Sequence, residues 1–124
     1  KLQTFFAGEE NVRLAFLIGS FAAGTARPDS DVDVAVLFGR VPDYMDVLGL
    51  RDRLSVLMER EADLVVLNDA GPVIRMQVLK TGIRLRAEQG AYEKFFVRTV
   101  NEYDDLKQIR APIAEAVLRK KIYA

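Results

Sequence analysis

Three aspartates are the residues of this chain best suited to chemistry. Asp31 and Asp33 flank Val32 in a short apolar segment, and Asp63 lies at the start of another such segment. Residues i and i+2 of a strand point to the same face, so the first two carboxylates should lie close together and repel each other. A divalent cation relieves that repulsion, and Mg²⁺ prefers a few carboxylates together with water and phosphate oxygens. Taken alone, an Asp-x-Asp pair also fits a solvated strand end.

Asp63 extends this pair if its strand lies next to the strand that follows Asp31. In that arrangement the third carboxylate faces the same cleft. It can then complete a three-carboxylate metal site and accept the proton of an attacking hydroxyl. Taken alone, Asp63 is equally typical of a capping or edge residue.

Gly19 and Ser20 suggest a place for phosphate. They follow an apolar segment at residues 13–18 and precede a stretch of small residues with room for a short helix. Glycine lets a backbone N–H approach a phosphate closely, the start of a helix adds unpaired donors, and the Ser20 hydroxyl adds one more. The dipeptide alone is more typical of a turn. Together with the three carboxylates, it supplies the parts that two-metal phosphoryl transfer requires.

Composition limits the alternatives. The 124 residues fit one compact domain, and 50% hydrophobic with 29% charged residues is typical of a globular chain. The chain has no cysteine and no histidine, which excludes disulfides, thiolate metal sites and a histidine general base. Catalysis must therefore use carboxylates, hydroxyls, lysine, arginine, backbone groups, or a metal bound by oxygen.

Charge and hydropathy indicate which partners and which cellular location to expect. The formal net charge is zero, with 7 basic and 11 acidic residues up to Asp63 and 11 basic and 7 acidic residues after it. The acidic first half suits cation binding, although chance segregation of surface charge explains it as well. A neutral chain gives no bulk attraction to nucleic acid, so we expect no direct nucleic-acid binding. No apolar run reaches the roughly 20 residues of a membrane helix, and no signal peptide is visible. We expect a cytoplasmic protein without a membrane partner.

Hydrophobic periodicity and turn residues predict the elements that position these side chains. The predicted strands cover residues 13–18, 32–38, 62–67 and, as an edge strand, 83–87. The first predicted helix covers residues 20–26, and the second runs from its cap Asp43 to about residue 59. The third covers residues 72–80, with Asn68-Asp69 as its cap and Gly82 at its end. The chain is predicted to be helical from residue 89 onward, with a kink at Pro112. Alternating strands and helices indicate the α/β or α+β class, with helices packed on a small sheet.

Apolar residues recur at helical spacing in the last predicted helix and predict a stripe that packs on the sheet. These residues are Phe96, Val100, Tyr103 and Leu106, and the later residues around 113–122 are predicted to overhang toward a partner or a second copy. Ser30 is interpreted as capping a turn and Arg27 as an exposed loop residue. Arg75 and Lys80 are interpreted as lying outside the cleft.

The site residues resemble the signature of the polymerase-beta-like nucleotidyltransferase superfamily. That signature is a strand, Gly-Ser or Gly-Gly, a loop, Asp-x-Asp on the next strand, and a third Asp on a later strand. Gly19 and Ser20 match its first part, Asp31 and Asp33 its second, and Asp63 its third. The resemblance extends from about residue 13 to residue 85. It implies one nucleotidyltransferase domain over residues 1–124, with a small mixed sheet flanked by helices and a C-terminal helical segment over about 89–124.

The resemblance also implies a role for each residue. Gly19 and Ser20 would hold the triphosphate of ATP, and Asp31 and Asp33 would bind both of two Mg²⁺ ions. Asp63 would bind the catalytic ion and orient or deprotonate the acceptor hydroxyl. Attack at the α-phosphorus would release pyrophosphate and transfer AMP.

The closer resemblance is to the minimal nucleotidyltransferases of prokaryotes, whose Gly-Ser-Phe-Ala-Arg-Gly run and Ser-Asp-x-Asp pair match residues 19–24 and 30–33. Ala23 stands where arginine is common there, and this predicts weaker nucleotide affinity or loop packing if that arginine serves either. The resemblance implies a type VII-like antitoxin that adenylylates a tyrosine hydroxyl of a HEPN-domain toxin. The chain has no length for an acceptor-holding domain, so the acceptor should be presented by another molecule. A homo-oligomer stays open.

Two other functions remain open at this point. The domain could block its toxin by binding alone, with a vestigial nucleotide site. It could also modify a small molecule, as aminoglycoside nucleotidyltransferases do, although those generally need more chain around the acceptor. Three converging carboxylates favour the protein-modifying enzyme over the pure binder.

Overall fold

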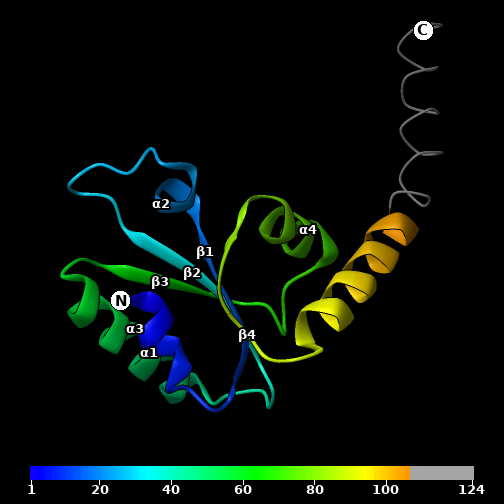
Figure 1. The fold of residues 1–124 in the computed structure, drawn as a ribbon, viewed down its shortest axis with the longest axis horizontal. Helices are drawn as coiled ribbons and strands as arrows, with labels where there is room; N and C mark the ends of the chain where they lie inside the picture. Colours follow the sequence, from blue (N-terminus) through cyan, green and yellow to red (C-terminus); the bar gives the residue numbers. More distant parts are fainter. Residues whose placement is uncertain (107–124) are drawn as a thin grey trace, which may run out of the picture.

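A four-stranded sheet with helices on both faces forms the part of the chain that the computed structural model describes, residues 1–106 (Figure 1). The strands are β1 (Val12–Ile18), β2 (Val32–Phe38), β3 (Ala62–Val66) and β4 (Ile83–Ala87). The helices are α1 (Leu2–Ala7), α2 (Gly19–Ala23), α3 (Tyr44–Met58), α4 (Pro72–Thr81) and a last helix at residues 91–106. The predicted kink at Pro112 and the predicted overhang at 113–122 lie outside the described residues.

The sheet has the strand order β3-β2-β1-β4 and is mixed, as predicted. β1 pairs antiparallel with β2 and with β4, whereas β2 and β3 run parallel. The parallel pair requires a crossover, and α3 supplies it. β4 is an edge strand, as predicted, and its neighbour β1 lies inside the sheet.

The two faces of the sheet bury separate sets of side chains. Val32, Val34 and Val36 of β2 face the core beneath α1 and α3, with Leu50 and Leu54 packing onto them. The opposite face carries the other set, which packs beneath α4 and the helix at 91–106. This second set consists of Leu14, Phe16, Ala35, Leu67, Val78 and Phe95. The alternation of β2 therefore assigns Asp33, which shares the parity of Ala35, to the face of α4.

Three expectations from the sequence need correction. Helix α1 was not predicted, although Leu2, Phe5 and Phe6 have helical spacing and pack into the core. In the last helix the buried positions are Phe95 and Thr99, one residue before the expected Phe96 and Val100, and Phe96 is 46% exposed. The helix meets the sheet along that shifted stripe.

The third correction concerns Asn68, which does not cap α4. The helix begins after Gly71 without a side-chain cap. The Asn68 side chain instead accepts a hydrogen bond from the Phe38 N–H at 2.9 Å and donates one to the Phe38 carbonyl at 2.8 Å. It thereby takes the place of a backbone partner at the end of β2.

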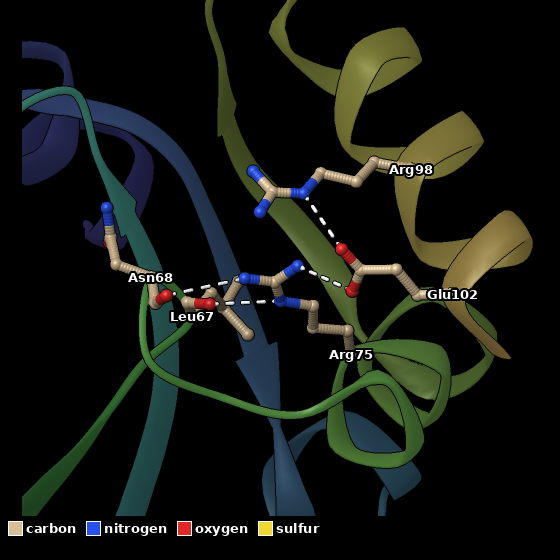
Figure 2. Close-up of polar contacts among 5 residues, drawn as sticks. All are labelled: Leu67, Asn68, Arg75, Arg98 and Glu102. Carbon is tan, nitrogen blue, oxygen red and sulfur yellow. Dashed lines mark hydrogen bonds and ion pairs between the residues drawn. The ribbon is translucent and has the colours of Figure 1, made fainter. Parts of the chain in front are cut away.

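Arg75 of α4 holds the last helix against the sheet (Figure 2). Only 6% of this residue is exposed, and its guanidinium donates to the carbonyls of Leu67 at 3.1 Å and Asn68 at 3.4 Å. It also pairs with the Glu102 carboxylate at 3.2 Å, and Glu102 receives a second hydrogen bond from Arg98. No helix among residues 1–106 is long and apolar enough to cross a membrane.

Candidate functional site

The three aspartates meet at the end of the sheet where β1 finishes and β2 and β3 begin. Asp33 and Asp63 are register partners across the parallel β2–β3 pair, so their side chains leave the same face as neighbours. Asp31 precedes β2 by one residue and has the same parity as Asp33. The condition set for Asp63, that its strand lies next to the strand that carries Asp33, is therefore met.

Gly19 brings the end of β1 against this group. Ile18 pairs with Asp33 in the antiparallel β1–β2 ladder, and Gly19 follows with a φ of 72°. A β-carbon built on Gly19 would lie 2.5 Å from Oδ2 of Asp33, well inside contact distance. Only glycine accommodates both the left-handed backbone and a carboxylate at this distance. The backbone that enters α2 therefore passes directly beside Asp33.

Asp33 is the electrostatic centre of the site. Its partial burial raises the pKa of its carboxyl above the ordinary 3.8, and the nearby carboxylates of Asp63 and Asp31 raise the pKa further. Burial and like charges both disfavour the ionised form. The aspartates are thus close enough to affect one another, and a cation between them would lower the energy of the charged state.

The donor set fits a magnesium ion that completes its coordination with substrate. Within residues 1–106, no group of three or more acidic side chains is already arranged to hold a metal ion. Mg²⁺ usually takes only one or two carboxylates and fills its octahedron with water and phosphate oxygens. The neighbours Asp33 and Asp63, with Asp31 beside them, suit this mode of binding.

Ser20 lies in the first turn of α2, and a structured loop leads from α2 to Asp31. Gly24 ends the helix with a φ of 75°, and the Thr25 N–H donates to the Ser20 carbonyl at 2.9 Å. Farther along, the Arg27 N–H donates to Ser30 Oγ at 2.7 Å. Ser30 therefore caps a turn, as predicted, and Arg27 is exposed, as predicted.

Sequence reasoning missed one residue beside the site, Arg60. It lies between α3 and β3, and its guanidinium contacts both α2 and the loop before Asp31. No motif marks it, because its partners are about thirty residues away in the sequence. Only the folded structure shows this contact.

A cavity lies at the opposite end of the sheet. It measures about 590 Å³, and Arg13, Asn68, Arg75 and Arg98 are among its lining residues, with none of the three aspartates. Arg75 is buried there and pairs with Glu102, which confirms that it lies away from the three aspartates. The catalytic candidates occupy an open edge instead, where Asp31 and Asp63 are exposed.

Comparison with known sequences gives consistent relatives. The family profile described as "Polymerase beta, Nucleotidyltransferase" matches residues 1–89. The protein adenylyltransferase MntA of Shewanella oneidensis is 33% identical over 107 residues, which covers 86% of this chain and 77% of that protein. A protein adenylyltransferase MntA of Thermococcus cleftensis is 33% identical over 69 residues, 56% of this chain and 70% of the relative.

Solved structures with the same fold include components of toxin–antitoxin complexes. One, described as a toxin-antitoxin with AMP-PNP, has a TM-score of 0.78 and 30% identity, over 94% of this chain and 96% of the other. Another is the tri-AMPylated Shewanella oneidensis HEPN toxin in complex with MNT antitoxin, with a TM-score of 0.73 and 26% identity over 94% and 96% of the two chains.

Proposed function

We propose, from the premise that the chain belongs to the polymerase beta nucleotidyltransferase family, that it transfers AMP from ATP to a tyrosine hydroxyl of a HEPN-domain toxin. The chain is a nucleotidyltransferase of the protein adenylyltransferase type and works within a toxin–antitoxin pair. The observation that carries the proposal is the register of Asp33 with Asp63, with Gly19 packed against Asp33. We place the reaction in the cytoplasm, where ATP is available.

The proposed reaction is an in-line displacement at the α-phosphorus of ATP. The acceptor oxygen forms a bond to the α-phosphorus while the bond to the bridging oxygen of the β-phosphate breaks, and pyrophosphate leaves with that electron pair. Asp63, the exposed second residue of β3, accepts the proton of the acceptor hydroxyl. Gly19 and Ser20 hold the triphosphate beside Asp33. Two bound Mg²⁺ ions, held by Asp31, Asp33 and Asp63, would neutralise the phosphate charge and acidify the acceptor hydroxyl.

Intact mass spectrometry of the toxin tests this proposal. A co-expressed HEPN partner is incubated with the chain, ATP and Mg²⁺, and is expected to gain one or more AMP units. The double variant Asp31→Asn with Asp33→Asn should abolish the gain, whereas Asp29→Asn, in the exposed loop before it, should retain it. An unmodified partner in a tight complex with the wild-type chain would contradict the enzymatic function for this pair.

The Asp63→Asn variant separates catalysis from blocking. An enzyme loses neutralisation of the toxin when Asp63 is replaced, because the proton acceptor and one metal ligand are gone, yet it still forms the complex. A purely steric antitoxin protects cells with or without this carboxylate. Growth of cells that carry the toxin, together with co-purification of the pair, therefore distinguishes the two functions.

A further inference from the structure

Arg60 lies at the junction of the segments that form the proposed site. It follows Glu59, which ends α3 in a left-handed conformation, and precedes β3, which brings Asp63. Its Nη1 donates to the Ser30 carbonyl at 3.2 Å and, more weakly, to the Arg27 carbonyl at 3.5 Å. The peptide group that Arg60 holds most closely is therefore the one that links Ser30 to Asp31.

The same guanidinium also contacts the segment that follows β1. Its central carbon lies 4.9 Å from the centroid of the Phe21 ring. Phe21 is the next residue after Gly19 and Ser20, and it packs against the core beneath α3. One half-buried side chain thus joins α2, the loop before Asp31, and the start of β3.

The loop has few other anchors to the sheet. The turn at Arg27 and Ser30 is closed internally, through the Ser30 N–H to the Arg27 carbonyl at 3.0 Å and the Arg27 N–H to Ser30 Oγ. These bonds shape the turn but do not attach it to the rest of the fold. Attachment comes from Arg60 and from the Val32 N–H, which donates to the Glu61 carbonyl at 2.9 Å. Both of these links come from the residues just before Asp63.

We infer that Arg60 is a positioning residue, which fixes Asp31 and the Gly19–Ser20 turn relative to Asp33 and Asp63. This inference rests on the proposed function. Arginine suits the task because its planar group can donate to carbonyls in its plane while its face stacks on an aromatic ring. Lysine retains the charge but lacks the planar fork. The identity of the side chain, and not only its charge, should therefore matter.

The test compares Arg60→Met and Arg60→Lys with the matched control Arg53→Met. Arg53 lies on α3, forms an ion pair with Glu9 just after α1, and its guanidinium carbon lies 5.5 Å from the centroid of the Phe5 ring. It therefore also combines a polar contact with an aromatic one, but away from the loop before Asp31. The readouts are amide hydrogen exchange of residues 24–32 without ligands, the melting temperature, and kcat, KM for ATP and the Mg²⁺ requirement of AMP transfer.

In both Arg60 variants the hydrogen-bonded amides of this stretch, those of Thr25, Arg27, Ser30 and Val32, are expected to exchange at least about tenfold faster, because local opening breaks the bonds that protect them. They should also lose about tenfold or more in kcat and need more Mg²⁺, since displacing a catalytic group by about 1 Å costs up to about 100-fold. Arg53→Met should lower the melting temperature by no more than the Arg60 variants do, and it should leave both the loop and the kinetics as in the wild type.

Three results decide the matter. The inference is overturned if both Arg60 variants keep slow exchange at 24–32 and behave kinetically like Arg53→Met. If the wild-type chain transfers no AMP, the proposed function is refuted. The amide hydrogen exchange measurement still decides in that case whether Arg60 anchors the loop. If Arg60→Met does not fold, Phe21→Leu is a milder variant, because it removes only the aromatic ring that Arg60 contacts. Unchanged amide exchange at residues 24–32 in this variant would also contradict the inference.

Discussion

Gly19 combines two constraints that are usually separate, a left-handed backbone and contact with a carboxylate. Its φ is 72°, and a β-carbon there would approach Asp33 Oδ2 to 2.5 Å. Gly24, five residues later, has nearly the same φ of 75° and open space around the missing β-carbon. The two glycines thus differ only in what a methyl group would displace.

Replacing Gly19 with alanine should therefore damage the site beyond the cost of backbone strain. We expect Gly19→Ala and Gly24→Ala each to lose about 1–2 kcal/mol of unfolding free energy from the left-handed conformation. Gly19→Ala should lose further stability and at least about tenfold in AMP transfer, because the methyl group displaces Asp33. Denaturant unfolding and transfer rates check this, and equal activity of the two variants would contradict it.

Asp33 should make the stability of the ligand-free fold depend on pH. Burial, then Asp63 and Asp31, raise the pKa of Asp33 above 3.8. A raised pKa in the folded state means that the fold gains stability while Asp33 is protonated, fully below the unfolded pKa, and loses it as pH rises through the raised value. Asp33→Asn cannot ionise, so the variant should be more stable than the wild type at pH 7.

Urea unfolding between pH 3.5 and pH 8 without Mg²⁺ measures this difference. The gap between Asp33→Asn and the wild type should widen with rising pH and close as the pH falls below 3.8. A gap that is constant over the whole range would indicate a packing change instead of an electrostatic one.

At the scale of elements, Arg75 joins α4, the turn after β3 and the helix at 91–106. Arg75→Met leaves the carbonyls of Leu67 and Asn68 and the Glu102 carboxylate without this donor. We expect a loss of about 2–3 kcal/mol in unfolding free energy, because hydrogen bonds to a charged group are strong and Glu102 is partly solvated.

Arg98→Met provides the matched comparison, because Arg98 bonds the same carboxylate from an exposed position. This substitution should lower the unfolding free energy by less than about 1 kcal/mol, as for other exposed ion pairs. AMP transfer per folded molecule should stay unchanged in both variants, since neither arginine lies near the aspartates. Equal destabilisation by the two substitutions would show that the hydrogen bonds of Arg75 to the two carbonyls add nothing.

Sequence reasoning reached the elements that show a local signal. Strands β1, β2 and β3 follow from apolar runs and alternation, whereas the adjacency of Asp33 and Asp63 could only be posed as a condition, because strand order is not encoded in either pattern. Asn68 was interpreted wrongly because an Asn-Asp pair before a helix is typical of a cap, whereas its actual partner, Phe38, is thirty residues away. Helix α1 was missed because six residues give too little periodicity, and Arg60 because its contacts are entirely non-local.

The proposed site depends on the whole folded domain, because only the complete sheet brings the end of β1 next to the starts of β2 and β3. MgATP should therefore stabilise the folded state as a unit. At a hundredfold excess over its dissociation constant, a ligand adds about 2.7 kcal/mol. That corresponds to a rise of roughly 10 °C in the melting temperature for a domain of this size.

Thermal unfolding with and without MgATP measures this rise. The double variant Asp31→Asn with Asp33→Asn should show little of it, and Asp29→Asn should show all of it. An equal rise in all three proteins would place nucleotide binding elsewhere on the fold.

The edge strand β4 has a consequence for self-association. The guanidinium carbon of Arg84 lies 4.1 Å from the centroid of the Tyr92 ring, and Arg86 donates to the Val12 carbonyl at 2.7 Å. Both cations therefore stay close to this edge of the sheet. Arg84 and Arg86 lie on opposite faces of this edge, so a second copy that added its own β4 in antiparallel fashion would bring like charges toward one another on each face. We therefore expect this edge to disfavour pairing with a second copy and to favour a strand that carries carboxylates.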